Sequence, residues 1–120
     1  MNFSNPLFII LCAHGIITLS AGLLMYYKPP KKINHLYGYR TKRSMSSQEK
    51  WDFAQKYSSQ EMIRQGIVIT GIGLVNLFLS VSEIVSVLIA ISLIIISVIL
   101  LLFKTEKQLK QKFDAHETLL

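Results

Sequence analysis

Apolar residues form three long blocks along the chain, and polar residues gather between the first two blocks and after the third. The blocks run from about residue 7 to 27, from 62 to 81 and from 84 to 103. A helix of about 20 residues spans roughly 30 Å, the thickness of the hydrocarbon core of a bilayer. The pattern therefore predicts an all-α membrane protein with three transmembrane helices in a single domain, residues 1–120.

The first block ends with strong signals. Tyr26 and Tyr27 are aromatic residues of the kind found at membrane interfaces, and Pro29 and Pro30 cannot continue the hydrogen bonding of a helix. No Lys or Arg precedes the block and no clear small-residue cleavage site follows it, so we expect a retained helix rather than a signal peptide. Residues 28–61 then form a long polar loop.

Within this loop the pattern predicts a short amphipathic helix over about residues 47–58. Ser46 and Glu49 have the spacing of a capping box, with Ser46 as the N-cap. A helical projection places three aromatic residues and an alanine on one side, namely Trp51, Phe53, Ala54 and Tyr57. We expect this helix to lie in the membrane interface or against the bundle, and to end at Ser58 and Ser59.

The distribution of Lys and Arg predicts the orientation. Nine of the 13 basic residues lie between residues 28 and 65 and four in the tail, residues 104–120, whereas the N-terminal segment and the turn at Ser82 and Glu83 have none. Short loops rich in Lys and Arg stay in the cytoplasm. We therefore expect a multi-pass protein of the cell membrane, with the N-terminus outside and the loop and C-terminus in the cytoplasm.

Composition narrows the partners and the chemistry. The net charge of +6 comes from basic residues beside apolar spans, which favours anionic lipid headgroups over nucleic acid as the partner. A single cysteine, Cys12, excludes an internal disulfide, and His14, His35 and His116 are too scattered for a metal site. The chain shows no enzyme motif, so we expect neither catalysis nor a cofactor.

The densest polar signal is the segment 34–41, Asn-His-Leu-Tyr-Gly-Tyr-Arg-Thr. Gly38 lies between two aromatic residues, which predicts a sharp turn or a close approach of the backbone to another group. The planar guanidinium of Arg40 has the geometry to bind a carboxylate or phosphate with two hydrogen bonds. The alternative is that Arg40 and its neighbours only hold anionic headgroups.

This segment, with Ser44 and the pair Trp51-x-x-Ala54, resembles the signature of the SdpI family of small bacterial membrane proteins. The residues that carry the resemblance are Asn34, Tyr37, Gly38, Tyr39, Arg40, Thr41, Ser44 and Trp51. The resemblance implies an immunity protein of the bacterial cell membrane that protects the producing bacterium from a secreted, membrane-active peptide toxin or bacteriocin. It also implies signalling, since the founding member is described as holding a transcriptional repressor at the membrane.

Two alternatives to immunity therefore stay open. One is a signalling or scaffold protein that recruits a soluble transcriptional regulator through the cytoplasmic loop. The other is a small lipid-handling or transport protein in which Arg40 and Lys42 hold an anionic headgroup or substrate.

Polar residues inside the predicted spans are a second candidate set. His14 and Asn76 fall at membrane depth, where an unsatisfied polar group is costly. One hypothesis is that they form a proton-sensitive or ligand-binding pair. The other, which we favour, is that they make interhelical hydrogen bonds that specify packing.

Small residues also align on one face of each span: Gly15, Thr18 and Gly22; Gly66, Thr70, Gly73 and Ser80; Ser86, Ala90 and Ser97. Such faces permit close packing within one chain or between two chains of a homodimer.

Overall fold

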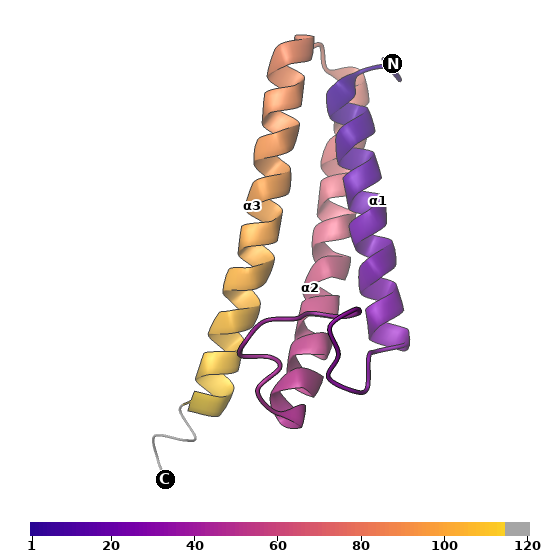
Figure 1. Ribbon diagram of the computed structural model, residues 1–120. Helices are drawn as coiled ribbons and strands as arrows, with labels where there is room; N and C mark the ends of the chain where they lie inside the picture. The colour runs from indigo at the N-terminus through magenta and orange to yellow at the C-terminus, as the bar shows by residue number, and fades with distance from the viewer. Residues whose placement is uncertain (115–120) are drawn as a thin grey trace.

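The computed structural model describes residues 1–114 as three long helices joined by a long loop and a short hairpin connection (Figure 1). The helices are α1 (Pro6–Tyr27), α2 (Gln48–Val75) and α3 (Glu83–Leu109), and two short helical turns, η1 (Asn76–Phe78) and η2 (Lys110–Asp114), follow α2 and α3. No strand occurs among the described residues, and all three helices are long and apolar enough to cross a membrane. The predicted all-α class with three spans is confirmed.

The three helices run alternately up and down, so the molecule has two distinct ends (Figure 1). The end that carries residues 28–47 between α1 and α2 is called the loop end below. The opposite end, where the N-terminus lies beside the connection from α2 to α3, is called the hairpin end. The final part of the predicted tail, residues 115–120, lies outside the described residues.

The separate amphipathic helix predicted over residues 47–58 is wrong. α2 is one uninterrupted helix that begins in the polar segment and continues through the apolar block. Ser58 and Ser59 do not end it, because their hydroxyls donate to the carbonyl oxygens of Gln55 (3.4 Å) and Lys56 (2.8 Å), three residues earlier in the helix. A serine that bonds back to its own helix in this way need not compete with the helical backbone for partners.

The helix boundaries shift accordingly. The N-cap of α2 is Ser47 rather than Ser46, since the Ser47 hydroxyl accepts a hydrogen bond from the backbone N–H of Lys50 at 3.2 Å. The α-helical part of α2 ends at Val75, six residues before the predicted limit of the span at residue 81. α3 continues past the predicted residue 103 to Leu109, so the start of the polar tail extends the last helix.

α1 and α2 pack with their backbones in close contact at the small-residue faces. A Cβ atom added at Gly66 would lie 2.6 Å from the backbone nitrogen of Leu19, and one added at Gly15 would lie 2.7 Å from the backbone nitrogen of Thr70. Both distances are shorter than van der Waals contact. The predicted small-residue faces on α1 and α2 therefore serve packing within this chain.

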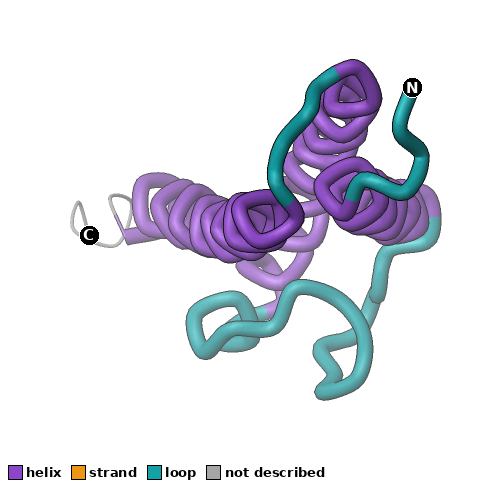
Figure 2. Tube along the Cα trace, turned by 90° about the horizontal axis from the view of Figure 1, so that it is seen from above, coloured by secondary structure: helices purple, strands orange, loops and turns teal. Residues whose placement is uncertain are grey.

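α3 diverges from α1 and α2 toward the loop end (Figures 1 and 2). In its membrane-spanning part only small residues of α3 are buried, namely Ser86, Ala90 and Ser97. Seen along the bundle, the loop extends to one side of the helices (Figure 2). The loop is thus placed to connect helices that separate at this end of the molecule.

Candidate functional site

The eight signature residues lie in the loop and in the first turn of α2, where side chains from α2 and α3 hold the loop in place. Three side chains hold the loop, namely Trp51 and Gln55 of α2 and Glu106 of α3. We call these three residues the loop clamp. Gln55 and Glu106 were not among the candidate residues of the sequence.

Trp51 holds the start of the loop. Its side chain is fully buried, and its indole Nε1–H donates to the carbonyl oxygen of Pro30 at 2.6 Å. A buried indole needs such a partner for its single donor. Trp51 therefore contributes both apolar packing and one hydrogen bond to the attachment of the loop.

Gln55 holds the middle of the loop through both groups of its amide. The Oε1 atom accepts from the backbone N–H of Tyr39 at 2.7 Å, and Nε2 donates to the carbonyl oxygen of Tyr39 at 2.8 Å. Gly38, with φ of 110°, lets the chain come this close, because a Cβ there would lie 2.6 Å from Gln55 Oε1 and 2.7 Å from Cγ of Pro30. The predicted close approach at Gly38 is thus observed, and its partner is a buried side chain of α2.

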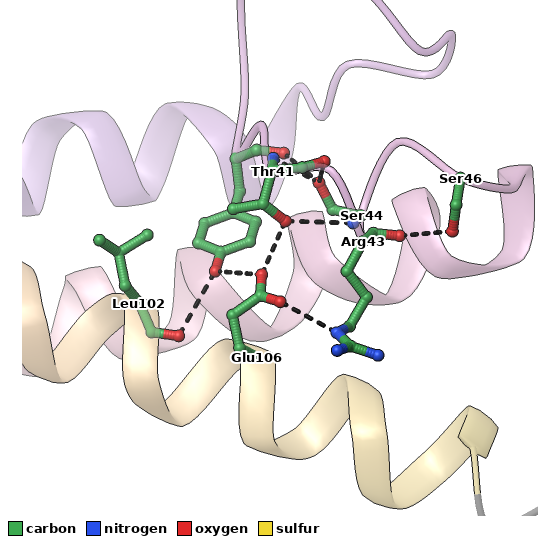
Figure 3. Close-up of polar contacts among 7 residues, drawn as sticks. Thr41, Arg43, Ser44, Ser46, Leu102 and Glu106 are labelled. Carbon is green, nitrogen blue, oxygen red and sulfur yellow. Dashed lines mark hydrogen bonds and ion pairs between the residues drawn. The ribbon is translucent and has the colours of Figure 1, made fainter.

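Glu106 joins the loop to α3 (Figure 3). Its Oε1 atom accepts from the phenol of Tyr39 at 2.8 Å and from the hydroxyl of Thr41 at 2.6 Å. Its Oε2 atom forms an ion pair with Nε of Arg43 at 3.2 Å. One carboxylate thus receives three hydrogen bonds from the loop, and two of them come from signature residues.

The signature residues also hold the loop in its own shape. The backbone N–H of Thr41 donates to Ser44 Oγ at 2.9 Å, and the backbone N–H of Ser44 donates to Thr41 Oγ1 at 3.1 Å. Asn34 Oδ1 accepts from the backbone N–H groups of Leu36 and Tyr37 at 2.9 and 2.7 Å. Such reciprocal bonds between short polar side chains and nearby backbone groups are typical of ordered turns.

Tyr37 and Arg40 complete this set of internal contacts. The phenol of Tyr37 donates to the carbonyl oxygen of Lys28 at 2.8 Å, which ties the turn to the end of α1. Arg40 Nη1 donates to the carbonyl oxygen of His35, and the Arg40 side chain is exposed. Arg40 is the charged residue of the signature, and its side chain is accessible to a partner.

The two polar residues predicted at membrane depth are not brought together. His14 Nε2 lies 3.1 Å from Ser97 Oγ, a contact between α1 and α3. Asn76 lies at the hairpin end, where its Nδ2 donates to the carbonyl oxygen of Ile72 at 2.7 Å and its own carbonyl accepts from Asn5 Nδ2 at 3.0 Å. The hypothesis of a His14–Asn76 pair is wrong, because Asn76 lies at the hairpin end, just after the last residue of α2, whereas His14 contacts Ser97 of α3.

A buried carboxylate on α2 was also missed. Glu61 is 2% exposed and binds Arg64 on the same helix and Nζ of Lys104 on α3, the latter at 3.0 Å. Glu61 fell outside the predicted second span, which began at residue 62. The three-residue spacing of Glu61 and Arg64, which places them on one helical face, was the available signal.

Glu61, Arg64 and Lys104 stand at one end of an apolar hollow between α2 and α3, which we call the α2–α3 groove. Its volume is about 280 Å³, and its apolar lining includes Val68 and Ile72 of α2 and Leu93, Ile96 and Leu100 of α3. Within residues 1–114, no three His, Cys, Asp or Glu side chains are grouped closely enough to hold a metal ion. His116 lies outside the part of the chain that the structure describes.

Replacing Glu106 with alanine is expected to release the loop from α3. The change removes the acceptor of three hydrogen bonds, and bonds to a charged group contribute about 1.5–3 kcal/mol each. Trypsin should then cut after Lys42 roughly tenfold faster or more, since proteases act on locally opened segments. Glu83→Ala, at the hairpin end, is the control and should leave the rate unchanged; equal rates for both variants would contradict the role given to Glu106.

The Tyr39 contact predicts a loss of stability at high pH. Burial, together with the adjacent Glu106 carboxylate that accepts its hydrogen bond, raises the pKa of Tyr39 above the ordinary value. The unfolded chain loses this proton at about pH 10, while the folded protein keeps it. The contribution of Tyr39 to stability is therefore complete below about pH 10 and is lost as the pH rises through the raised pKa.

A titration of tyrosinate absorbance checks this prediction. We expect the wild type to show one tyrosine that ionises last, and Tyr39→Phe to lack that step. If the variant shows the same last step as the wild type, the assignment to Tyr39 is wrong.

The chain was compared with known proteins. A sequence model of the SdpI/YfhL protein family matches residues 31–102, which include most of the loop, all of α2 and most of α3. The chain is 41% identical over 99 residues to the protein named "Uncharacterized protein YfhL" of Bacillus subtilis (strain 168), in an alignment that covers 80% of this chain and 82% of the relative. No solved structure matches the chain significantly.

Proposed function

The chain belongs to the SdpI/YfhL protein family, and from this membership and the geometry of the site we propose that it is an integral membrane immunity protein. In this proposal it protects the bacterium that produces it from a secreted, membrane-active toxin. Three apolar helices and the family identify a multi-pass membrane protein. The action against a toxin, the way in which the toxin contacts the protein and the orientation of the protein in the membrane are all parts of this proposal.

The observation that carries the proposal is that the signature residues are engaged inside the molecule. Tyr39, Ser44 and Trp51 are buried, and their polar groups bind other groups of the chain. A loop held in this way acts as a scaffold that fixes the ends of α2 and α3. The apolar faces of the helices are then the surface left for a toxin that inserts into the bilayer.

The orientation supports contact within the membrane. By the distribution of Lys and Arg, the loop end faces the cytoplasm and the hairpin end faces outward. A secreted toxin arrives at the hairpin end and enters the bilayer beside the spans. Immunity in this scheme comes from binding the inserted toxin along the helices, and the loop clamp keeps these helices in position.

The test uses the bacterium's own secreted products, so the toxin need not be identified beforehand. The gene is deleted, and the deletion strain is grown in culture fluid of its parent with or without a plasmid copy of the gene. We expect the fluid to kill the deletion strain and the plasmid copy to restore survival. Survival of the deletion strain at the level of the parent would contradict immunity.

Two variants distinguish a loop that only holds the helices in position from a loop that contacts the toxin directly. Arg40→Ala removes an exposed charge whose one described bond is to the carbonyl of His35, so we expect it to reach the membrane and still protect. Gln55→Ala removes two hydrogen bonds to Tyr39 and should impair protection together with stability. Loss of protection in Arg40→Ala at normal membrane abundance would assign the loop a direct role in recognition.

A second candidate function is recruitment of a soluble transcriptional regulator, and the exposure of Leu36 favours it. This side chain is 91% exposed, and Arg40 and Lys42 are exposed in the same loop. An apolar side chain among cations suits an acidic, partly apolar partner surface. Leu36→Ser should then abolish co-purification of the regulator without changing the helical content of the protein.

A further inference from the structure

We propose that the α2–α3 groove binds one anionic phospholipid of the bilayer, with an acyl chain in the apolar hollow and the phosphate at Arg64 and Lys104. This site is distinct from the loop and from Arg40 and Lys42. It is independent of the proposed immunity, because lipid binding is measured without any toxin.

The size and lining of the groove fit an acyl chain. Its volume of about 280 Å³ lies at the lower end of the range for small-molecule sites. The lining is mainly aliphatic, and it includes Val68, Ile96 and Leu100.

The charges at one end of the groove favour an anion. Arg64 and Lys104 each bind the buried carboxylate of Glu61, so two cations share one anion and the cluster keeps a net charge of +1. Their side chains are 63% and 41% exposed, compared with 2% for Glu61. An ammonium has three donors and a guanidinium has five, so both cations have donors beyond the bond to Glu61.

A buried donor without a partner lies at the same place. Gln65 lines the groove, and its Nε2 atom is inaccessible to solvent and has no hydrogen-bond partner among residues 1–114. A buried amide nitrogen left unpaired is costly. A turn of the Gln65 amide toward the groove would bring this donor to a phosphate or glycerol oxygen of a bound lipid.

The position of the charged cluster matches the headgroup level of one leaflet. Glu61 adjoins Met62 and Ile63, which pack against Gly22 near the loop end of α1, and Lys104 lies near the loop end of α3. Ile72 and Leu93 extend the groove from there toward the hairpin end. A lipid bound there has its headgroup at the loop end and its chain directed into the hydrocarbon core. In the predicted orientation this is the cytoplasmic leaflet, which basic segments recognise through anionic lipids.

The test measures lipid retained by the purified full-length protein in detergent, using native mass spectrometry. The probes are phosphatidylglycerol and phosphatidylcholine with the same acyl chains. We expect one phosphatidylglycerol to be retained in preference to phosphatidylcholine. Arg64→Gln and Lys104→Gln should each weaken its retention about fivefold, whereas Lys32→Gln, on the exposed loop, should leave it unchanged.

Glu61→Gln separates a lipid site from a purely internal ion cluster. The change removes the carboxylate that competes with the phosphate for Arg64 and Lys104, so retention of phosphatidylglycerol should rise severalfold. If the three residues serve only one another, retention will stay the same or fall, and the proposal is overturned. Circular dichroism confirms that the helices of each variant are intact.

A pair of matched substitutions tests the groove itself. Leu100 and Leu102 are equally exposed on α3, at 42%, but only Leu100 lines the groove. Leu100→Trp should fill the hollow and displace the lipid, while Leu102→Trp should not. Equal retention of lipid in both variants overturns the proposal. The proposal is also overturned if Leu100→Trp converts a dimer to a monomer and leaves the bound lipid unchanged, because the groove would then bind a second copy of the chain.

Discussion

Gly66→Ala is expected to lower the free energy of unfolding by about 2–3 kcal/mol. The added Cβ would lie 2.6 Å from the backbone nitrogen and 2.7 Å from the Cα atom of Leu19, so a change of rotamer cannot relieve the clash. Overpacking of this kind costs about 1–3 kcal/mol, and contact with backbone places it at the upper end. α1 should therefore be displaced from α2.

The matched control is Gly71→Ala in the same helix. A Cβ at Gly71 meets nothing within 4 Å, so this change should be neutral or stabilise the helix by up to about 1 kcal/mol. Unfolding by a harsh detergent in mixed micelles, followed by the fluorescence of Trp51, measures both variants. If the two alanines have the same effect, the close helix contact at Gly66 is not formed in the membrane.

Trp51→Ala is expected to destabilise the protein by about 3–5 kcal/mol, the range for removing a fully buried aromatic side chain. It also leaves the carbonyl of Pro30 without its donor, so the start of the loop should detach. Trp51→Phe keeps most of the volume and loses only the hydrogen bond, which contributes about 1 kcal/mol. Thermal unfolding followed by circular dichroism is the measurement, since the fluorescent side chain is absent.

Tyr27→Ala is the control for Trp51. Tyr27 is also aromatic and close to the loop, but it is 74% exposed at the end of α1. Its removal should change the free energy of unfolding by less than about 0.5 kcal/mol. A large effect of Tyr27→Ala, or a small one of Trp51→Ala, would show that burial against the loop is not what Trp51 provides.

The sequence predicted the spans because their signal is local and strong. Each apolar block is long enough to cross a bilayer, and the stop at Pro29 and Pro30 is written in adjacent residues. The close approach at Gly38 was likewise visible, since the residue type itself indicates it. None of these features requires knowledge of which distant residue is the partner.

The loop clamp was not predictable in the same way. The helical projection leaves Gln55 off the side that carries the aromatic residues, yet its amide is buried against Tyr39. Glu106 lies 67 residues from Tyr39 in the sequence, in a segment that reads as a charged tail. Periodicity separates polar from apolar residues, but it does not tell a solvated polar group from one satisfied by a distant backbone group.

The same limit of periodicity explains why α2 was predicted as a short helix followed by a separate span. Residues such as Ser58, Ser59 and Glu61 interrupt the apolar pattern, so the span appeared to begin after them. In the structure the serines bond to their own helix and Glu61 binds two cations. Polar residues whose hydrogen bonds and ion pairs are satisfied thus lie inside one helix, where the sequence pattern suggested two separate helices.

The location of Glu106 has a consequence for how the protein is made. The loop is synthesised before α2 and α3, but the carboxylate that binds Tyr39, Thr41 and Arg43 lies in the last turn of α3. During synthesis the loop can bind Trp51 and Gln55 early, yet its attachment to α3 must wait until the third helix has been inserted with the correct orientation. A chain with α3 missing or inverted lacks the Glu106 contacts, so its loop is held by α2 alone and opens more readily.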